Sequence, residues 1–260
     1  MIFLVIAKYQ ALFRQIKEKA PTDPIVYSNP EKIINIPFPY LGTTSPVERF
    51  AIKSDESFDY MGREGFAQVL AVIESLKIPN GFRKFHIYGS IGYGKSHILA
   101  AMACLLFQQG KRVVYLPDCR AMAEDFLEYF KRSLLTTFGD SEHIQLEILG
   151  CNSVDAIMSF CKRIALADDI YLYFIIDQLN ALDYDETQKD KLTNDKRKFT
   201  QNAIDIITSV HFAITSASAN YQAALHMQEK QTSEIKVSLF GGLTEVWNFF
   251  VKLRLVIFTH

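Results

Sequence analysis

Eight consecutive residues have the types and spacing needed to hold a chain of phosphate groups. The run fits the Walker A pattern G-x-x-x-x-G-K-[ST] in full and consists of Gly89, Ser90, Ile91, Gly92, Tyr93, Gly94, Lys95 and Ser96. Glycines let a loop wrap phosphate oxygens without Cβ clashes, so that several backbone N–H groups converge on them. Lys95 is placed to neutralise the β- and γ-phosphates, and the Ser96 hydroxyl to ligate Mg²⁺. The run therefore predicts a phosphate-binding loop (P-loop) for Mg-ATP; a glycine-rich turn that happens to precede a lysine is the alternative.

The residues on either side of this loop give it the expected setting. Residues 85–88 form an apolar run typical of a strand, and residues 95–109 have the pattern of a helix that stops at Gly110. The unpaired N–H groups and positive dipole end of such a helix favour an anion. His97 is counted with the loop among the residues that contact the nucleotide. A helix-surface position is the commoner interpretation of such a histidine, and no catalytic role is expected of it.

A buried strand that ends in an acidic residue is expected to complete the metal site. Residues 171–176 are uninterruptedly apolar, as in a strand covered on both faces, and Asp177 follows them. We predict that this carboxylate reaches the Mg²⁺ shell; an Asp-initiated turn is the alternative. Gln178 stands where many ATPases carry a catalytic Glu. A carboxamide orients water but takes no proton from it, so we expect Gln178 to position water and hydrolysis to be slow. Nearby acids are alternative bases: Asp183, Asp185 and Glu186.

Two further segments resemble nucleotide-contacting parts of known ATPases. Gly62, Arg63 and Glu64 resemble the Gly-Arg-Glu box upstream of the P-loop in AAA+ and STAND ATPases, where the segment lies near the adenine. The resemblance implies that Gly62 and Arg63 contact the nucleotide; an exposed Arg-Glu pair at a helix start is the alternative. In additional-strand ATPases, a strand between the P-loop strand and the Asp strand ends in a polar sensor of the γ-phosphate. The strand predicted at residues 211–215 leads into candidates for that role, or into a serine-rich turn: Thr215, Ser216, Ser218 and Asn220.

Several stretches together resemble the NTPase module of Crinkler-type effectors, which is related to retrotransposon-hot-spot (RHS-type) proteins. They are GSIGYGKSH at residues 89–97, FIIDQLNAL at 174–182, AITSASAN at 213–220 and LFGGLTE at 239–245. The most specific part is DQ-x-N-A-L, which begins at Asp177. The resemblance covers residues 60–250 and implies an AAA+/STAND-like ATPase that normally couples to another domain, often nuclease-like or kinase-like. The chain ends at His260, so we expect a truncated or minimal member, and the expectation drawn from the resemblance does not extend to host targeting or DNA cleavage.

The elements that must position these residues alternate between apolar runs and helical segments. Strands are predicted at residues 85–88, 112–116, 171–176 and 211–215, and helices at 66–76, 95–109, 122–138, 154–166 and 198–209. This order predicts an α/β fold, a three-layer parallel-sheet P-loop NTPase. Six of the eight prolines lie in residues 21–46, so residues 1–58 are expected to form a loop-rich N-terminal extension without a long helix. The NTPase core is predicted at 59–225, and residues 226–260 form a C-terminal segment, interpreted as the start of a truncated second domain.

Composition limits the classes of partner. Hydrophobic residues make up 49% of the chain and charged residues 22%, so a sizeable core is expected. The net charge of -1 gives no global reason to expect nucleic acid or a membrane as partner. Residues 1–7 lack the basic start of a signal peptide and no run reaches transmembrane length, so an intracellular protein, cytoplasmic or nuclear, is expected. The cysteines lack metal-ligand spacing and are interpreted as core residues: Cys104, Cys119, Cys151 and Cys161.

We therefore expect an ATP-driven conformational switch that hydrolyses ATP slowly and docks on a protein partner or a sister subunit. A small-molecule P-loop kinase is one alternative, but such enzymes use an arginine-rich lid, and the late chain offers only Arg197 and Arg254. A non-hydrolysing nucleotide-binding scaffold is another, supported by Gln178. ATP is favoured over GTP, because residues 193–196 lack the buried strand that precedes a guanine-reading NKxD motif.

Overall fold

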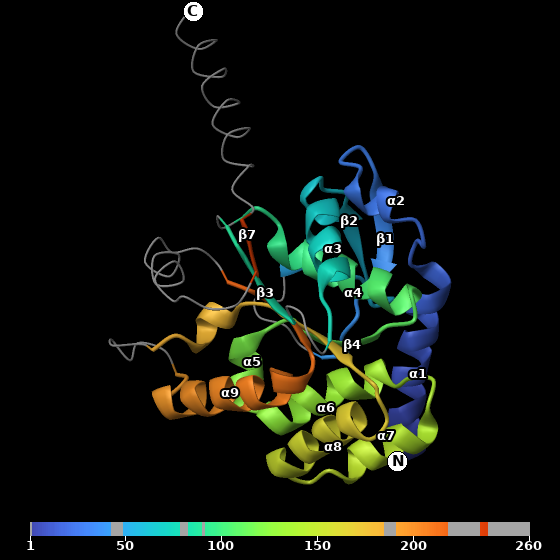
Figure 1. Cartoon of the computed structure of the whole chain (residues 1–260). Coiled ribbons are helices and arrows are strands. Elements are labelled where there is room, and N and C mark those ends of the chain that lie inside the picture. Colours follow the sequence, from blue (N-terminus) through green and yellow to red (C-terminus); the bar gives the residue numbers. More distant parts are fainter. Residues whose placement is uncertain are drawn as a thin grey trace, which may run out of the picture.

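A parallel sheet forms the centre of the molecule (Figure 1). The computed structural model describes residues 2–42, 49–78, 83–89, 92–184, 191–217 and 235–238. Within these residues the sheet has five strands in the order β4-β5-β6-β3-β7. Their bounds are Lys84–Tyr88 for β3, Arg112–Leu116 for β4, Leu172–Ile176 for β5, Phe212–Ser216 for β6 and Ile235–Ser238 for β7. Every neighbouring pair is parallel, so the strands' carboxyl ends meet at the same edge of the sheet.

The position of β6 confirms the predicted additional strand. β6 pairs on one side with β3, which leads into the P-loop, and on the other with β5, which leads into Asp177. Ser216 lies opposite Ile87, and Thr215 opposite Ile176. The loop, the acidic residue and the end of β6 are therefore brought to one place by the register of the sheet.

Helices cover both faces of the sheet, which confirms the three-layer α/β fold (Figure 1). On one face lie α3 (Gly65–Ser75) and α4 (Lys95–Gln108); on the other lie α5 (Cys119–Glu124), α6 (Phe126–Thr137), α8 (Val154–Leu166) and α9 (Asn194–Ile207). From β3 the chain crosses the sheet to β4, and from β4 it returns in the opposite direction to β5 and β6. Because each crossover between parallel strands is right-handed, the helices before and after β4 lie on opposite faces. No helix among the described residues is long and apolar enough to cross a membrane.

Helix α4 is buried on every side, and this fixes the loop that precedes it. Every residue from Ile98 to Phe107 is at most 1% exposed. A surface helix would keep one polar face in water, whereas α4 packs against β4 on one side and against α1, α3 and β1 on the others. Cys104 is one of its core residues, and the other cysteines are buried as well, which confirms the interpretation of all four as core residues.

The N-terminal segment contains a long helix that the proline pattern did not predict. Helix α1 (Ile2–Lys19) ends before Pro21, so its residues carry no proline and are free to form a helix. Its buried residues recur at helical spacing: Ile6, Tyr9, Leu12 and Ile16. The expectation of an extension without a long helix is therefore wrong for residues 2–19, and α1 bridges the two helical layers by packing against α4 and α6.

The proline-rich stretch itself contains short elements. Helix α2 (Pro24–Ser28) is capped by the Asp23 carboxylate, which accepts a hydrogen bond of 2.9 Å from the Ile25 N–H. Strands β1 (Ile33–Pro37) and β2 (Ser57–Met61) pair antiparallel in a separate two-stranded sheet. Buried side chains of all these elements belong to the same hydrophobic cluster as the central sheet. The division of the chain at residue 58 stays a prediction.

Two other expectations differ from the structure. The helix predicted at 122–138 is two helices, α5 and α6, separated at Asp125, whose φ of -144° leaves the helical region. The Asp125 carboxylate accepts a hydrogen bond of 3.4 Å from the Glu128 N–H, so this residue begins α6 rather than continuing α5. Helix α7 (Glu142–Gly150) was not predicted, and α9 begins at Asn194, four residues before the helix predicted at 198–209.

Candidate functional site

A cleft of about 470 Å³ lies where the P-loop and the end of β5 meet. Ligands of open α/β sheets bind outside the carboxyl ends of the strands, and this cleft is in that position. Its lining brings together the predicted residues Arg63, Gly92, Gly94, Lys95, Ser96, His97, Asp177 and Gln178, and adds Arg49 and Asn180. The predicted positions Gly62, Gly89 and Tyr93 adjoin the cleft without being among its lining residues.

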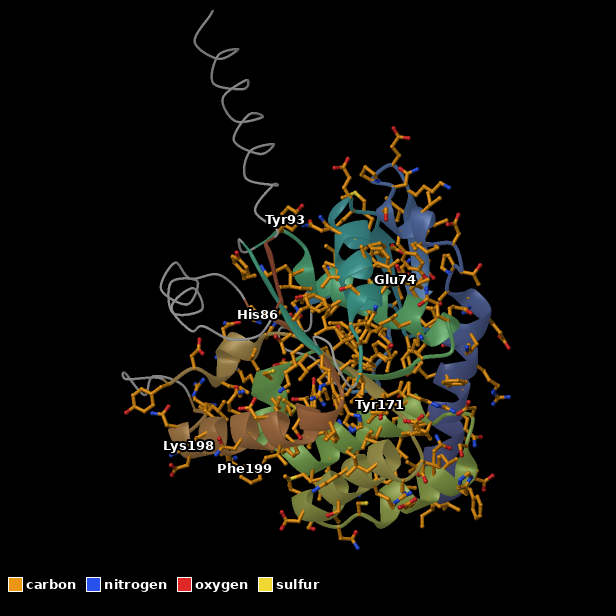
Figure 2. All side chains as sticks on the ribbon, viewed as in Figure 1. Glu74, His86, Tyr93, Tyr171, Lys198 and Phe199 are labelled. Carbon is orange, nitrogen blue, oxygen red and sulfur yellow. The ribbon has the colours of Figure 1, made fainter. Side chains whose placement is uncertain are left out.

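The P-loop has the backbone that its glycines predict. Gly92 and Gly94 have φ angles of +85° and +83°, in the left-handed region that other residues adopt only at a cost. Gly94 is also the N-cap of α4, so the first N–H groups of the helix face the cleft. Tyr93 is partly buried against the core and lies at the end of the sheet where the P-loop joins α4 (Figure 2). The predicted residues Ser90 and Ile91 lie outside the described residues.

Lys95 is the first residue of α4 and is 8% exposed. Its Nζ donates a hydrogen bond of 2.8 Å to the carbonyl oxygen of Gly89, across the base of the loop. Burial lowers the pKa of the Lys95 ammonium, and the nearby charge of Asp177 partly opposes this effect. The charged form is thus less favourable here than in water, which a bound anion would correct.

Asp177 is 2% exposed and is held by donors from several elements. Its Oδ1 accepts hydrogen bonds from the Ser216 hydroxyl and from the Gln178 N–H, the latter at 2.9 Å. Its Oδ2 accepts a hydrogen bond of 3.0 Å from Nη2 of Arg49. The Asp177 N–H donates to the carbonyl of Leu116 at 2.9 Å, which extends the pairing of β4 with β5. A buried carboxylate needs such compensation, and here it is both paired and fixed in orientation.

Arg49 is a cleft residue that was not predicted from the sequence. Its guanidinium bridges Asp177 and the carbonyl oxygen of Pro117, to which Nη2 donates at 2.9 Å. It also lies over the ring of Phe50, with 5.1 Å from Cζ to the ring centroid. The contact with Asp177 spans 128 positions and belongs to no local motif. Only its occurrence shortly before Gly62–Glu64 could have drawn attention to it.

Arg63 lies directly against the P-loop. A Cβ added at Gly94 would come within 2.5 Å of Arg63 Cζ, so the guanidinium packs on the backbone of that glycine. Gly62 is equally constrained, because a Cβ there would lie 2.0 Å from the carbonyl oxygen of Asn29. The Arg63 N–H donates to Tyr27 O at 3.0 Å, which fixes the segment. The structure thus places Arg63 in the cleft; its role and that of Gly62 stay predictions.

Gln178 and His97 line the cleft beside these charged groups. Gln178 has φ 61° and ψ 40°, a left-handed conformation that is strained for a residue with a side chain. His97 packs on Phe50, with ring centroids 5.0 Å apart. Burial lowers the pKa of His97, and the charges of Arg63 and Arg49 lower it further, so the imidazole is neutral near pH 7.

The candidates for a polar sensor separate in the structure. Ser216 donates its hydroxyl to Asp177. Thr215 contacts β3 instead, where its Oγ1 lies 2.7 Å from Nδ1 of His86 in a hydrogen bond. Ser218 and Asn220 lie outside the described residues, as do the alternative bases Asp185 and Glu186. Asp183 is described and is not among the residues that line the cleft.

The lining groups complement a complex of Mg²⁺ with a nucleoside triphosphate. Arg49, Arg63 and Lys95 are cations, and Asp177 is the carboxylate among the described lining residues, a net charge of +2. Nε of Arg63, and Nε and Nη1 of Arg49, are buried with no hydrogen-bond partner among the described residues. Buried donors are nearly always paired, so these groups fit a bound anion. Ser96 and Asp177 offer the oxygen ligands that Mg²⁺ prefers.

No family model matches the sequence, and neither does any curated protein. Solved structures that match the chain at low similarity include DnaA from Aquifex aeolicus bound to AMPPCP (18% identity, TM-score 0.34, 67% of this chain and 44% of that chain). They also include PCH-2 from C. elegans (10%, 0.37, 75% and 45%) and the HORMA:CdnC:Trip13 complex of E. coli MS115-1 (13%, 0.34, 80% and 68%). The chain spans less than half the length of the first two. Strand order and the P-loop identify the fold as that of P-loop NTPases.

Proposed function

We propose that this chain binds Mg-ATP in the cleft and hydrolyses it slowly. The observation that carries the proposal is the convergence of Lys95 and Asp177 in one cleft, at the ends of two strands separated by β6. One end of the sheet thereby combines helix N–H groups, a buried ammonium and a fixed carboxylate. Stabilising a transferring phosphoryl group requires those three kinds of group.

Each cleft residue has a role in this proposal. Lys95 exchanges its bond to Gly89 for the β- and γ-phosphates. Ser96 and Asp177 would hold Mg²⁺, which would supply positive charge against the terminal phosphates. Ser216 orients Asp177 by binding Oδ1, so that Oδ2 is presented to the metal. The proposed contacts of the other predicted residues are backbone donation by Gly89, Ser90, Ile91, Gly92, Tyr93 and Gly94, and nucleotide contacts by Gly62, Arg63 and His97.

Gln178 limits the rate in this proposal. Its carboxamide hydrogen-bonds and orients an attacking water but accepts no proton at neutral pH, so the water is not activated by a side-chain base there. Its strained backbone directs the side chain at the cleft, as is common for residues held in place for function. The same residue supports a second candidate function, a nucleotide-binding scaffold without turnover.

The proposed output is a conformational switch of the AAA+/STAND kind in an intracellular protein. Nucleotide state changes residues 177–194 and the C-terminal segment, and through them the docking of a protein partner or of a sister subunit. The likeness of the sequence to the NTPase module of Crinkler/RHS-type proteins supports this finer assignment. The charge balance gives no support to nucleic acid as the partner.

Calorimetric titration of the purified chain with Mg-ATP, Mg-GTP and Mg-ADP tests the proposal. We expect ATP to bind with a Kd in the micromolar range, GTP more weakly, and both to lose affinity when EDTA removes the metal. Phosphate release is then measured at low and high protein concentration. Slow phosphate release whose rate per molecule rises with protein concentration supports a self-associating ATPase. Absence of phosphate release at both concentrations supports the scaffold. No binding of any nucleotide contradicts the proposal; phosphate transfer to nucleosides or sugars would indicate a kinase.

A further inference from the structure

Arg49 occupies the Asp177 oxygen atom at which a metal ion would bind. Oδ1 of Asp177 is bound by donors that the fold fixes, the Gln178 N–H and the hydroxyl at the end of β6. Oδ2 is bound by the side chain of Arg49 at 3.0 Å. A metal ligated by Asp177 would therefore bind at Oδ2, where its charge would repel that of the Arg49 guanidinium at short range.

Arg49 has donors that are suited to a second acceptor. Nη2 serves Asp177 and Pro117, while Nε and Nη1 are buried with no partner among the described residues. The side chain is 14% exposed and lines the cleft that holds Lys95 and Gly94. A planar guanidinium in this position matches the paired oxygens of a phosphate group.

We propose, on the basis of the function proposed above, that Arg49 is a nucleotide-sensing residue. It pairs with Asp177 until Mg²⁺ takes Oδ2, and it then binds the terminal phosphate of the nucleotide. The exchange couples the N-terminal segment that carries Arg49 to the number of phosphates in the cleft. Mg-ADP also displaces Arg49 from Asp177 but offers it no terminal phosphate, so Arg49 favours ATP over ADP.

The alternative role for Arg49 is structural, a tie between the N-terminal segment and the sheet. Its contacts with Phe50 and Pro117 would serve that role equally well. The two roles differ in one measurable property. A structural tie affects ATP and ADP binding alike, whereas a phosphate sensor affects their ratio.

Titration of the full chain and of Arg49→Ala with Mg-ATP and Mg-ADP measures this ratio. We expect the ATP-over-ADP preference of the wild type to fall by about 10- to 100-fold in Arg49→Ala, the effect of losing one charge-assisted phosphate contact. Arg49→Lys keeps the charge without the paired donors and should lose part of the preference. Arg163→Ala is the matched control, because Arg163 also pairs with carboxylates, those of Glu147 and Asp168, outside the cleft. It should leave the ratio unchanged.

A second measurement uses the unmodified chain and needs no variant to fold. The Nε–H resonance of Arg49 in a nitrogen-15 NMR spectrum should shift differently with Mg²⁺ and a non-hydrolysable ATP analogue than with Mg-ADP. An ATP/ADP ratio in Arg49→Ala within twofold of the wild type, or the same Arg49 resonance with both nucleotides, overturns the Arg49 proposal alone. Failure of the wild type to bind any nucleotide overturns the proposed function, and the inference with it.

Discussion

Replacing Lys95 with alanine should separate stability from nucleotide binding. Lys95 is a buried ammonium whose pKa is lowered by burial, so its charge is held at a cost in the free energy of folding. Its removal also deletes the hydrogen bond to Gly89. These effects oppose each other, and we expect the free energy of unfolding without nucleotide to change by less than about 1 kcal/mol.

With nucleotide present, Lys95→Ala should strongly reduce the stabilisation of the folded state by Mg-ATP. At 100 times its Kd, a ligand stabilises the folded state by about 2.7 kcal/mol, which raises the melting temperature of a chain this long by about 5–10 °C. Lys95 is expected to make charge-assisted contacts with two phosphates, each worth about 1.5–3 kcal/mol. Their loss weakens binding by at least about 100-fold. At the same Mg-ATP concentration the stabilisation falls to about 0.4 kcal/mol, or about 1 °C.

Differential scanning fluorimetry with and without Mg-ATP measures both effects on one sample. Lys131→Ala is the matched control, because Lys131 is also a buried helical lysine, 7% exposed, with a hydrogen bond to Leu149 O at 3.3 Å and a salt bridge to Glu128 at 3.4 Å. It should lower the melting temperature and keep the full shift with Mg-ATP. A Lys95→Ala protein that keeps more than half of the wild-type shift would refute the reasoning.

Three other changes test particular contacts. Gly94→Ala should weaken Mg-ATP binding by at least about tenfold, because its Cβ would displace Arg63, whose Cζ lies 2.5 Å away, and the left-handed φ of +83° adds a cost of about 1–2 kcal/mol. Gly110→Ala is the control: Gly110 also has a left-handed φ, +80°, but no atom within 4 Å of an added Cβ. This variant should lower the melting temperature by the same backbone strain and should bind Mg-ATP as the wild type does. Gln178→Gly should raise stability by about 0.5–1 kcal/mol by relieving the strain at φ 61°, and should slow phosphate release; unchanged release would mean that Gln178 does not position water. His211 has a pKa lowered from 6.5 to about 4 by burial, so the unfolded chain binds its proton more tightly than the folded one. Its contribution is complete above pH 6.5 and is lost as the pH falls toward 4, by about 2 kcal/mol between pH 7 and pH 5 in urea unfolding. His211→Gln should remove this part of the pH dependence, and the exposed His143→Gln should not.

Burial is the main cause of the lowered pKa of His211, and the hydrogen bond from Leu172 also disfavours protonation. Nε2 donates to the carbonyl of Cys161 at 3.0 Å, and Nδ1 accepts from the Leu172 N–H at 3.2 Å. The neutral ring with its proton on Nε2 satisfies both partners. A second proton on Nδ1 would face the Leu172 N–H, two donors directed at each other in a site that is 0% exposed.

The sequence predicted those parts of the site whose signals are local. The P-loop and its helix are contiguous, and β5 with Asp177 is an apolar run followed by one acid, so both could be identified without tertiary information. Ser216 could be proposed as well, because the class of fold places β6 between the other two strands. Arg49 could not, since its partner lies 128 positions away. Helix α1 could not be predicted from proline content, because the prolines begin at Pro21 and disfavour a helix only from that position onward.

The cations of the cleft show that the N-terminal segment belongs to the site. Arg49 precedes the predicted boundary at residue 58, Arg63 follows it, and Lys95 begins α4, yet all three line one cleft. Holding three cations in one cleft is unfavourable without an anion. Among the described lining residues Asp177 is the carboxylate, and it pairs directly with one of the three, Arg49. A bound Mg-triphosphate would supply both the metal for Asp177 and the anion for the arginines. Binding at the P-loop should therefore rearrange the contacts of the N-terminal segment, and Arg49→Ala, which keeps the buried residues of that segment, should lose this coupling while its P-loop is intact.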